Sequence, residues 1–298
     1  MIGAILYFYG INLSDLKKIG TDYYFKHQDR DYTIFLYDRN PNEALEIYYL
    51  NLEILNKGVI GYDIILTKGK EVLFLYENKY YILMQLPDVK NRVITYNDIL
   101  KFNYKPIIKI EHLDKSNWSY NWSNKIDFIE YQFDQIKNKY KKIDESINYF
   151  IGIWENGISY FNDNYDYSKE KVITHKRISA NMDLLNFLNP LNFIIDYKER
   201  DIGDYIKSYA FKNNYSLNNI ELFLKGVDRN SIILIISRLL FPSYYFDIYE
   251  DIVLEQKKET DIYDILNKKN NVIKIIAFII EKYQKYNIPV IAWIKNEV

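Results

Sequence analysis

Polar and apolar residues alternate with a period of two along much of the first third of the chain, and this period predicts β-strands. The first two predicted strands lie at 23–27 and 32–37, and the polar sequence QDRD between them predicts a hairpin with a four-residue turn. Three further strands are predicted at 62–67, 72–76 and 79–86, separated by the short polar sequences KGKE and EN. Strands joined by tight turns predict an antiparallel sheet.

One helix interrupts these strands. After Pro41 the apolar residues recur every three or four positions, and Gly58 supplies a C-terminal stop; the recurring residues are Leu45, Tyr48 or Tyr49, Leu52 and Leu55. A helix packed on one face of an antiparallel sheet makes an α+β lobe, which we place at residues 1–88.

Helices dominate the rest of the chain. Over 126–154 the spacing of apolar residues alternates between three and four, which predicts one amphipathic helix of about eight turns, buried in a second lobe rather than forming a lone coiled coil. Two more helices are predicted at 228–241, which Pro242 ends, and at 261–285. We therefore expect a larger, mainly helical C-terminal lobe at residues 89–298.

The charge balance argues against a nucleic-acid partner. Lys plus Arg, 39 in all, nearly cancel the 40 Asp plus Glu, so no overall positive field is available to attract a polyanionic chain. The absence of cysteine excludes disulfides and thiolate nucleophiles, and with three scattered histidines a zinc site is not expected. The 31 tyrosines accompany many Ile, Asn and Lys residues, a bias typical of A/T-rich codons rather than of stacking platforms for bases.

Neither an export signal nor a membrane span is expected. The first twenty residues have no basic segment ahead of an apolar run and no small-residue cleavage site. The apolar stretches 231–241 and 272–283 are interrupted by Arg238, Lys274 and Glu281, and both are shorter than the roughly 20 residues that a span needs. We predict that they are buried helices of a soluble protein.

Residues 171–209 form the candidate site, because short apolar pieces alternate there with polar turns and one apolar run ends on a carboxylate. The segment THKRI contains His175 and Arg177. After it come Pro190, Asp196 and the pair Arg200 and Asp201, in FIIDYKERDIGDYIKSY. These motifs resemble the catalytic and metal loops of the aminoglycoside phosphotransferase and choline kinase-like superfamily, and more closely its spore coat branch, the CotS and YutH type. The order of elements is similar over nearly the whole chain.

The resemblance implies a bilobal protein-kinase-like fold and a phosphoryl-transfer site. Such a site positions a lysine on the third strand, a glutamate on the following helix, an aspartate as base, and an Asn and an Asp that hold metal. The resemblance places Asp196 as the metal aspartate and Glu43 or Glu46 as the helix glutamate, and these weakly predict a nucleotide and metal site.

The other catalytic parts are missing. Arg177 stands where the superfamily has its catalytic aspartate, and an arginine cannot accept a proton. The strand at 32–37 has no lysine, no Gly-rich loop precedes it, and Asn181 lies one residue short of the expected metal-binding asparagine. Each such part typically contributes tenfold factors in rate, so fast transfer from ATP is not expected.

Each candidate also has a structural interpretation. His175 is expected to be a buried histidine that holds its loop, and Asp196 a capping or ion-paired carboxylate. Arg177 and Asp201 are predicted to form a charge-assisted pair that fixes the loop, together with Arg200. The remaining polar groups are assigned to the surface: Asp204 and Lys207 as a solvated pair, and His27 and His112 as isolated residues.

The sequence therefore predicts a pseudokinase of bacterial origin that acts by protein contacts in the cytoplasm or the spore coat, with spore coat proteins as partners and with no cofactor of its own. The alternative is an ATP-dependent small-molecule kinase with a rearranged site. In that case Asp196 holds magnesium, ATP is the cosubstrate, and another carboxylate such as Asp183 acts as base.

Overall fold

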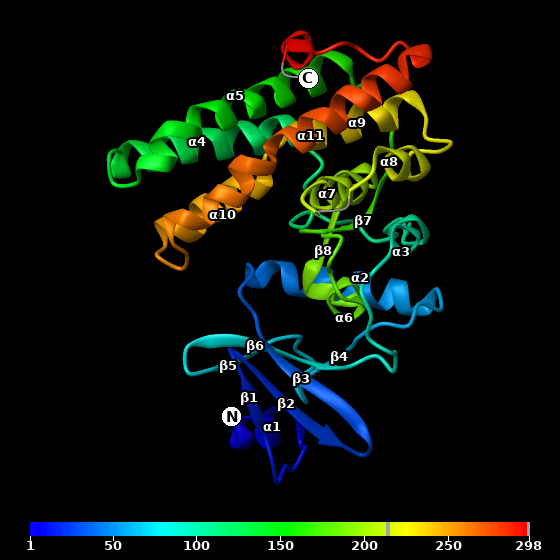
Figure 1. The fold of residues 1–298 in the computed structure, drawn as a ribbon. Coiled ribbons are helices and arrows are strands. Elements are labelled where there is room, and N and C mark those ends of the chain that lie inside the picture. Colours follow the sequence, from blue (N-terminus) through cyan, green and yellow to red (C-terminus); the bar gives the residue numbers. More distant parts are fainter. Residues whose placement is uncertain (213–214, 297–298) are drawn as a thin grey trace.

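A computed structural model describes residues 1–212 and 215–296. The chain folds into two lobes, an N-terminal one built on an antiparallel sheet and a larger helical one, with a short two-stranded ribbon between them (Figure 1). The predicted α+β, bilobal, protein-kinase-like class is confirmed. The predicted boundary at residues 88 and 89 stays a prediction, and it falls in the connection between the last strand of the sheet and the next helix.

The N-terminal sheet has six strands, all paired antiparallel. Its order is β1-β2-β3-β6-β4, and β5 also pairs with β6. The strands are β1 (Lys17–Ile19), β2 (Asp22–His27), β3 (Arg30–Leu36), β4 (Asp63–Ile65), β5 (Phe74–Tyr76) and β6 (Lys79–Gln85). The short outer strand β1 is an addition to the predicted set.

The hairpin between β2 and β3 turns more tightly than the sequence suggested. Gln28 and Asp29 both have positive φ, at 49° and 59°, which is the two-residue turn that matches the twist of antiparallel strands. The other two residues of QDRD, Arg30 and Asp31, therefore belong to β3. The predicted turn EN is confirmed, since Glu77 and Asn78 also have positive φ.

The sheet is covered on both faces, and this corrects the prediction of a single helix. Helix α1 (Ile2–Tyr9) packs through Ile5 on the face that carries Ile34 and Leu83. The alternate residues Ile82 and Met84 point to the opposite face, which packs into the main core. Burial on both faces explains why β6 is apolar at successive positions.

The predicted helix after β3 is α2 (Ala44–Asn56), preceded by a 3₁₀ turn at Pro41–Glu43 in which the Asn40 side chain accepts a hydrogen bond from the Asn42 amide. Gly58, with φ of 82°, follows its C-terminal end, as predicted. The helix also contacts Pro190–Asn192 of the second lobe, so one continuous core joins the two lobes.

The second lobe contains nine α-helices and the ribbon of β7 (Lys171–His175) with β8 (Phe193–Tyr197), counting only the part of the chain that is described. The helices are α3 (Tyr96–Lys101), α4 (Trp118–Ile136), α5 (Lys141–Asn164), α6 (Leu184–Leu188), α7 (Glu199–Ala210), α8 (Leu217–Phe223), α9 (Arg229–Leu240), α10 (Ser243–Val253) and α11 (Tyr263–Lys282). Short 3₁₀ turns lie at Pro190–Asn192, Glu259–Ile262, Gln284–Tyr286 and Ala292–Asn296. The predicted helices at 228–241 and 261–285 are confirmed as α9 and α11.

The single long helix predicted over 126–154 is wrong. The chain forms α4 and α5 instead, which lie side by side (Figure 1). Asn138 breaks the helix with φ of 69°, and its amide donates to the carboxylate of Asp144 in the first turn of α5. The apolar spacing of three and four continues across this break, so periodicity alone could not reveal it.

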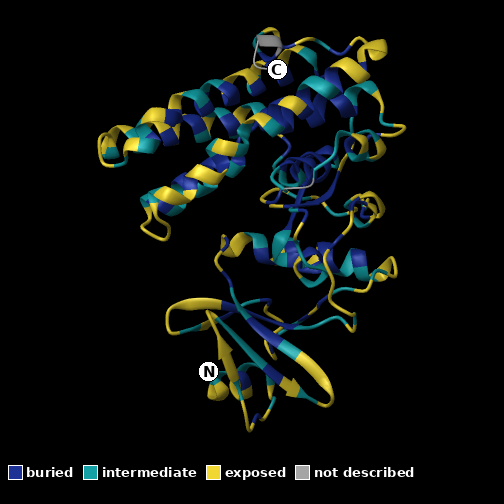
Figure 2. Ribbon diagram, viewed as in Figure 1, coloured by how far each residue is buried: buried dark blue, intermediate teal, exposed yellow. Residues whose placement is uncertain are grey.

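Helix α9 forms the centre of the second lobe, packed between α5 and α7. Figure 2 shows α7 and α9 almost entirely buried. By length and composition the stretch Arg229–Val253 could cross a membrane, but 78% of its apolar window is buried inside the protein, and Pro242 divides it into α9 and α10. This stretch is therefore the core of the second lobe.

Candidate functional site

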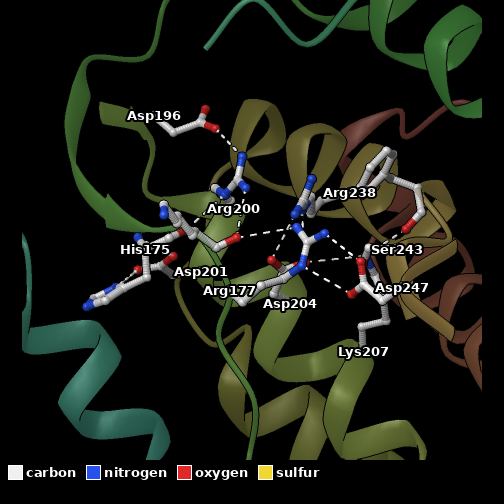
Figure 3. A network of polar contacts seen from close by, with 12 residues as sticks. His175, Arg177, Asp196, Arg200, Asp201, Asp204, Lys207, Arg238, Ser243 and Asp247 are labelled. Atoms are coloured by element: carbon white, nitrogen blue, oxygen red, sulfur yellow. Dashed lines mark hydrogen bonds and ion pairs between the residues drawn. The ribbon is translucent and has the colours of Figure 1, made fainter. Parts of the chain in front are cut away.

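His175 ends strand β7 and is completely buried. The Asp201 carboxylate accepts a hydrogen bond from the His175 backbone amide at 3.1 Å and lies 2.6 Å from Nδ1, while Nε2 lies 2.9 Å from the carbonyl oxygen of Phe187 (Figure 3). With both ring nitrogens engaged inside the protein, His175 holds the loop that follows it. No ring nitrogen is left to exchange a proton with a substrate.

Arg177 lies two residues further on and turns toward α10. Its Nη2 is 2.7 Å and its Nε 3.2 Å from the two carboxylate oxygens of Asp247 (Figure 3). The predicted pair of Arg177 with Asp201 is wrong, because Asp201 binds His175 instead. The error arose because α10, which supplies the true partner, lies some seventy residues away in sequence.

Asp196 lies on β8 with its side chain fully buried. Its oxygens accept hydrogen bonds from Trp118 Nε1 at 2.8 and 3.0 Å, and from Arg200 Nη1 at 2.8 Å. Burial raises the pKa of the Asp196 carboxyl, and the charge of Arg200 opposes this shift. Among the described residues no group of three or more His, Cys, Asp or Glu could hold a metal ion. Metal binding by Asp196 stays a prediction.

Arg200 is the residue that connects these groups. Besides Asp196 it binds two backbone carbonyls, with Nε donating to His175 at 3.1 Å and Nη2 donating to Lys176 at 3.0 Å. Its donors therefore tie the start of α7 to the end of β7 and to β8. Trp118, at the start of α4, had no sequence signal beyond its size, although it supplies two of the contacts of Asp196.

Glu46 has a different role from the one implied by the resemblance. Its carboxylate accepts hydrogen bonds from the backbone amides of Glu111, His112 and Leu113, and His112 Nδ1 lies 3.0 Å away. Although partial burial raises its pKa, these contacts lower the pKa of Glu46 overall. Glu46 thus fastens the segment 111–113 to α2, and His112, predicted to be isolated, has a partner.

A buried basic group that faces the second lobe from the first is Arg39, which follows β3. Arg39 is 9% exposed; its Nε donates to Glu43 at 2.6 Å, and its Nη1 donates to the carbonyls of Leu191 at 2.8 Å and Phe193 at 2.9 Å. Strand β3 itself carries no lysine. An arginine bonded to glutamate therefore bridges the lobes close to the strand on which the resemblance implies a phosphate-binding lysine. Arg39 was not predicted because it lies outside that strand.

Asp204, Lys207 and Arg238 form a buried charge network, which overturns the prediction of a solvated pair. Arg238 contacts both oxygens of Asp204, at 2.9 and 2.8 Å, and Lys207 Nζ lies 3.3 Å from Asp204 and 2.7 Å from the carbonyl oxygen of Phe241 (Figure 3). Burial raises the pKa of Asp204, but the charges of Arg238 and Lys207 outweigh this effect and hold that pKa below its usual range. Burial lowers the pKa of Lys207 to about 7.

Asp183, the candidate for a rearranged base, caps a helix. Its carboxylate accepts a hydrogen bond from the Asn186 amide at 2.9 Å at the start of α6 and another from the Asn186 side chain at 2.6 Å. These are the contacts expected of an N-cap residue. The residue is therefore engaged in local structure.

A cavity of about 710 Å³ lies between the lobes, and we call it the interlobe cavity. Its walls come from the connection between β3 and α2, from α4, from the loop after β7, and from β8, α7 and α9. The lining residues are Asp38, Arg39, Asn40, Glu43, Lys115, Asn121, Trp122, Lys125, Lys176, Arg177, Ile194, Arg200, Arg238 and Phe241. Seven of these fourteen are Lys or Arg, and two are acidic.

The cavity does not fit magnesium and ATP in the manner of an active kinase. Asp196 binds Trp118 and Arg200, Glu43 binds Arg39, and a guanidinium occupies the position of the base. A divalent metal needs oxygen ligands that face it, whereas seven of the nine charged residues of this surface are cations.

Comparison with solved structures supports the fold. An aminoglycoside phosphotransferase from Alicyclobacillus acidocaldarius aligns with a TM-score of 0.63 and 8% identity, covering 96% of this chain and 97% of that one. An AMP-bound spectinomycin phosphotransferase aligns with a TM-score of 0.59 and 16% identity, covering 92% of this chain and 96% of its own. At such identities the similarity shows the fold alone.

Sequence comparison defines the family. The endospore coat-associated protein YutH of Bacillus subtilis is 23% identical over 333 aligned positions, which cover 98% of this chain and 97% of that protein. Residues 3–276 match the family described as "Spore coat putative kinase YutH". The chain therefore belongs to the YutH family of kinase-like spore coat proteins.

Proposed function

We propose that this protein is a pseudokinase, a kinase-like fold that has lost phosphoryl transfer and acts in the bacterial spore coat as a structural or assembly protein. The observation that carries the proposal is the state of the catalytic positions. Arg177, where the base is expected, is ion-paired with Asp247, and Asp196 is bound by Trp118 and Arg200. The relative from Bacillus subtilis, described as endospore coat-associated, supports the location.

The missing groups cannot be replaced by small movements. A base must be within hydrogen-bond reach of the proton that it removes, and the guanidinium of Arg177 has no lone pair to accept one. For Asp196 to bind a metal, it would first have to leave the buried guanidinium of Arg200. Breaking such a buried pair typically costs roughly 3–5 kcal/mol.

The function that we assign is therefore binding. Its partners are proteins of the spore coat, and its location is the cytoplasm or the spore coat. A folded lobe pair held by internal ion pairs provides a stable surface for such contacts, but the fold alone does not select the partner.

Turnover of ATP tests the loss of catalysis. Purified protein is incubated at stoichiometric concentration with ATP and magnesium, and the phosphorus NMR spectrum is followed for hours beside an active aminoglycoside phosphotransferase with its own substrate. We expect no ADP beyond the protein-free sample. Sustained ADP formation that is lost in Arg177→Ala or Asp196→Asn, with the melting temperature retained, would show an enzyme and contradict the proposal.

A further inference from the structure

We propose that the interlobe cavity is a binding site for a compact polyanion of the polyphosphate class, held by lysine and arginine side chains without a divalent metal ion. The inference rests on the proposed function in one respect, because it treats the cavity as a binding site and not as a catalytic centre. Three features of the cavity support it: the charge of the lining, one lysine within the lining, and the cavity's size.

The lining is far more basic than the protein as a whole. The chain carries a net charge of −1, yet seven Lys or Arg residues face the cavity beside only Asp38 and Glu43. Several lining cations have carboxylate partners that are not part of the lining, namely Asp196, Asp204, Asp247 and Glu250. These partners hold the basic groups in place and offset part of their charge, while the donor groups that face the cavity are mainly basic.

Lys176 is the lining residue best placed to bind an anion. It is half-buried, and its Nζ makes no hydrogen bond or ion pair with any residue that the structure describes. Burial and the neighbouring Arg39 lower its pKa to about 8, so its charge is poorly stabilised in the cavity.

The backbone of Lys176 is fixed, in contrast to its side chain. Its amide donates to the carbonyl of Asn192 at 2.7 Å, and its own carbonyl accepts from Arg200 at 3.0 Å. The ammonium group has no partner of its own, so it can bind a ligand phosphate without first breaking an ion pair, and only its side chain has to be ordered.

The size and shape of the cavity favour a small ligand. Its volume of about 710 Å³ falls within the roughly 300–1,000 Å³ of small-molecule sites. The rings of Trp122 and Phe241 stack 4.9 Å apart in its wall, and the guanidinium of Arg238 lies over the Phe241 ring, 4.6 Å from its centroid. Two or three linked phosphates would bring three or more negative charges into this space. The arginines of the lining already bind carboxylates or carbonyls, so they contribute charge, and Lys176 offers the donor without a partner.

The same lining explains why we propose a complex without magnesium. A metal ion needs several oxygen ligands, and Glu43, one of the two carboxylates in the lining, is already bound to Arg39 at 2.6 Å. Magnesium would also neutralise the ligand that the basic side chains attract. Free polyphosphate should therefore bind more tightly than its magnesium complex, the reverse of the order at a kinase nucleotide site.

Titration calorimetry with sodium tripolyphosphate in a buffer containing EDTA tests the proposal. We expect saturable binding of one ligand per chain, weakened about tenfold or more in Lys176→Met. The matched control is Lys274→Met, which removes the same charge from an exposed position on α11 outside the cavity. Lys115→Met serves as a second cavity variant if Lys176→Met does not fold, as judged by its melting temperature.

The outcomes are distinct. Weaker binding in the cavity variants alone, and weaker binding when magnesium replaces EDTA, would support the site. Equal affinity in the cavity and control variants, stronger binding with magnesium, or no binding at millimolar tripolyphosphate would overturn it. Tighter binding of hexaglutamate than of tripolyphosphate would also overturn it, in favour of an acidic peptide. ATP turnover is measured separately, so failure of the pseudokinase proposal would be recognised independently.

Discussion

At the scale of single residues, the most unusual feature is a lysine in the protein interior. Lys207 has 3% of its surface exposed, and it lies beside Asp204, which also binds Arg238. Arg177 is a further positive group nearby. Two cations share one buried carboxylate here, so the charge of Lys207 is only partly compensated, and burial lowers its pKa from 10.5 to about 7.

This lysine should make stability depend on pH. Below pH 7 Lys207 is charged in both the folded and the unfolded states, and the folded state carries the full cost of burying it. Between pH 7 and about 10.5 the unfolded chain keeps a proton that the folded protein has lost, so the free energy of unfolding rises with pH, by up to about 1.4 kcal/mol per unit. Lys207→Met should remove this rise.

Urea unfolding of the wild type and of Lys207→Met at several values between pH 6.5 and 9 measures the effect. Because all other groups titrate in both proteins, the difference between the two curves isolates Lys207. The stability of the variant relative to the wild type should be highest at low pH and should fall as the pH rises. Parallel curves would mean that Asp204 keeps Lys207 charged throughout. Lys274→Met, at an exposed position, should change nothing.

The residues of the candidate site were identified from the sequence more readily than their partners. His175, Asp196 and Arg200 were located from short motifs, and all three lie within one connected network. Trp118, the partner of Asp196, lies 78 residues away from it in sequence, and Asp247, the partner of Arg177, lies 70 residues away. No local pattern joins either partner to the motif. Long-range contacts of this kind depend on how helices cross, which periodicity does not specify.

At the scale of elements, two helices cross closely because of a glycine. Gly203 lies on α7 against α9, and a β-carbon there would lie 2.8 Å from Cγ and 2.9 Å from Cβ of Arg238. Those distances are shorter than real carbon contacts, so a larger residue must separate the helices. The separation would also move the Arg238 guanidinium away from Asp204.

We expect Gly203→Ala to lower the free energy of unfolding by about 1–3 kcal/mol, as overpacking of a core typically does. Gly152→Ala is the matched control, because Gly152 lies within α5 and its β-carbon would meet nothing within 4 Å. There the better helix propensity of alanine should stabilise the protein by up to about 1 kcal/mol. Chemical denaturation measures both, and a neutral Gly203→Ala would show that the crossing can relax.

Elements with a strong period were predicted well from the sequence. The strands β2, β3 and β6 and the helices α2, α9 and α11 follow the apolar patterns, because local burial determines both the pattern and the element. The break between α4 and α5 was missed since one asparagine with positive φ interrupts no apolar position. Helix α1 was missed because eight mostly apolar residues show little contrast between faces.

At the scale of the whole molecule, the two lobes share one hydrophobic core and are also joined by polar contacts. Arg39 makes two of these contacts, to the carbonyls of Leu191 and Phe193, and it also binds Glu43 within its own lobe. The similarity in fold to phosphotransferases was anticipated from motifs and element order, because fold survives where catalytic residues do not. The contacts of Arg39 with the second lobe could not be predicted, since the sequence around a single arginine after a strand does not indicate its partner.

Removing the bridge should loosen the lobes. Arg39→Ala leaves the Glu43 carboxylate and two largely buried carbonyls without their donor, so we expect a loss of about 2–5 kcal/mol in the free energy of unfolding. Because the lost contacts join the lobes, hydrogen exchange measured by mass spectrometry should increase selectively at 39–46 and 190–194, with α9 still protected. Arg30→Ala, at an exposed position on β3, is the control. Equal exchange in both variants would mean that apolar packing of α2 against Pro190–Asn192, and not Arg39, holds the lobes together.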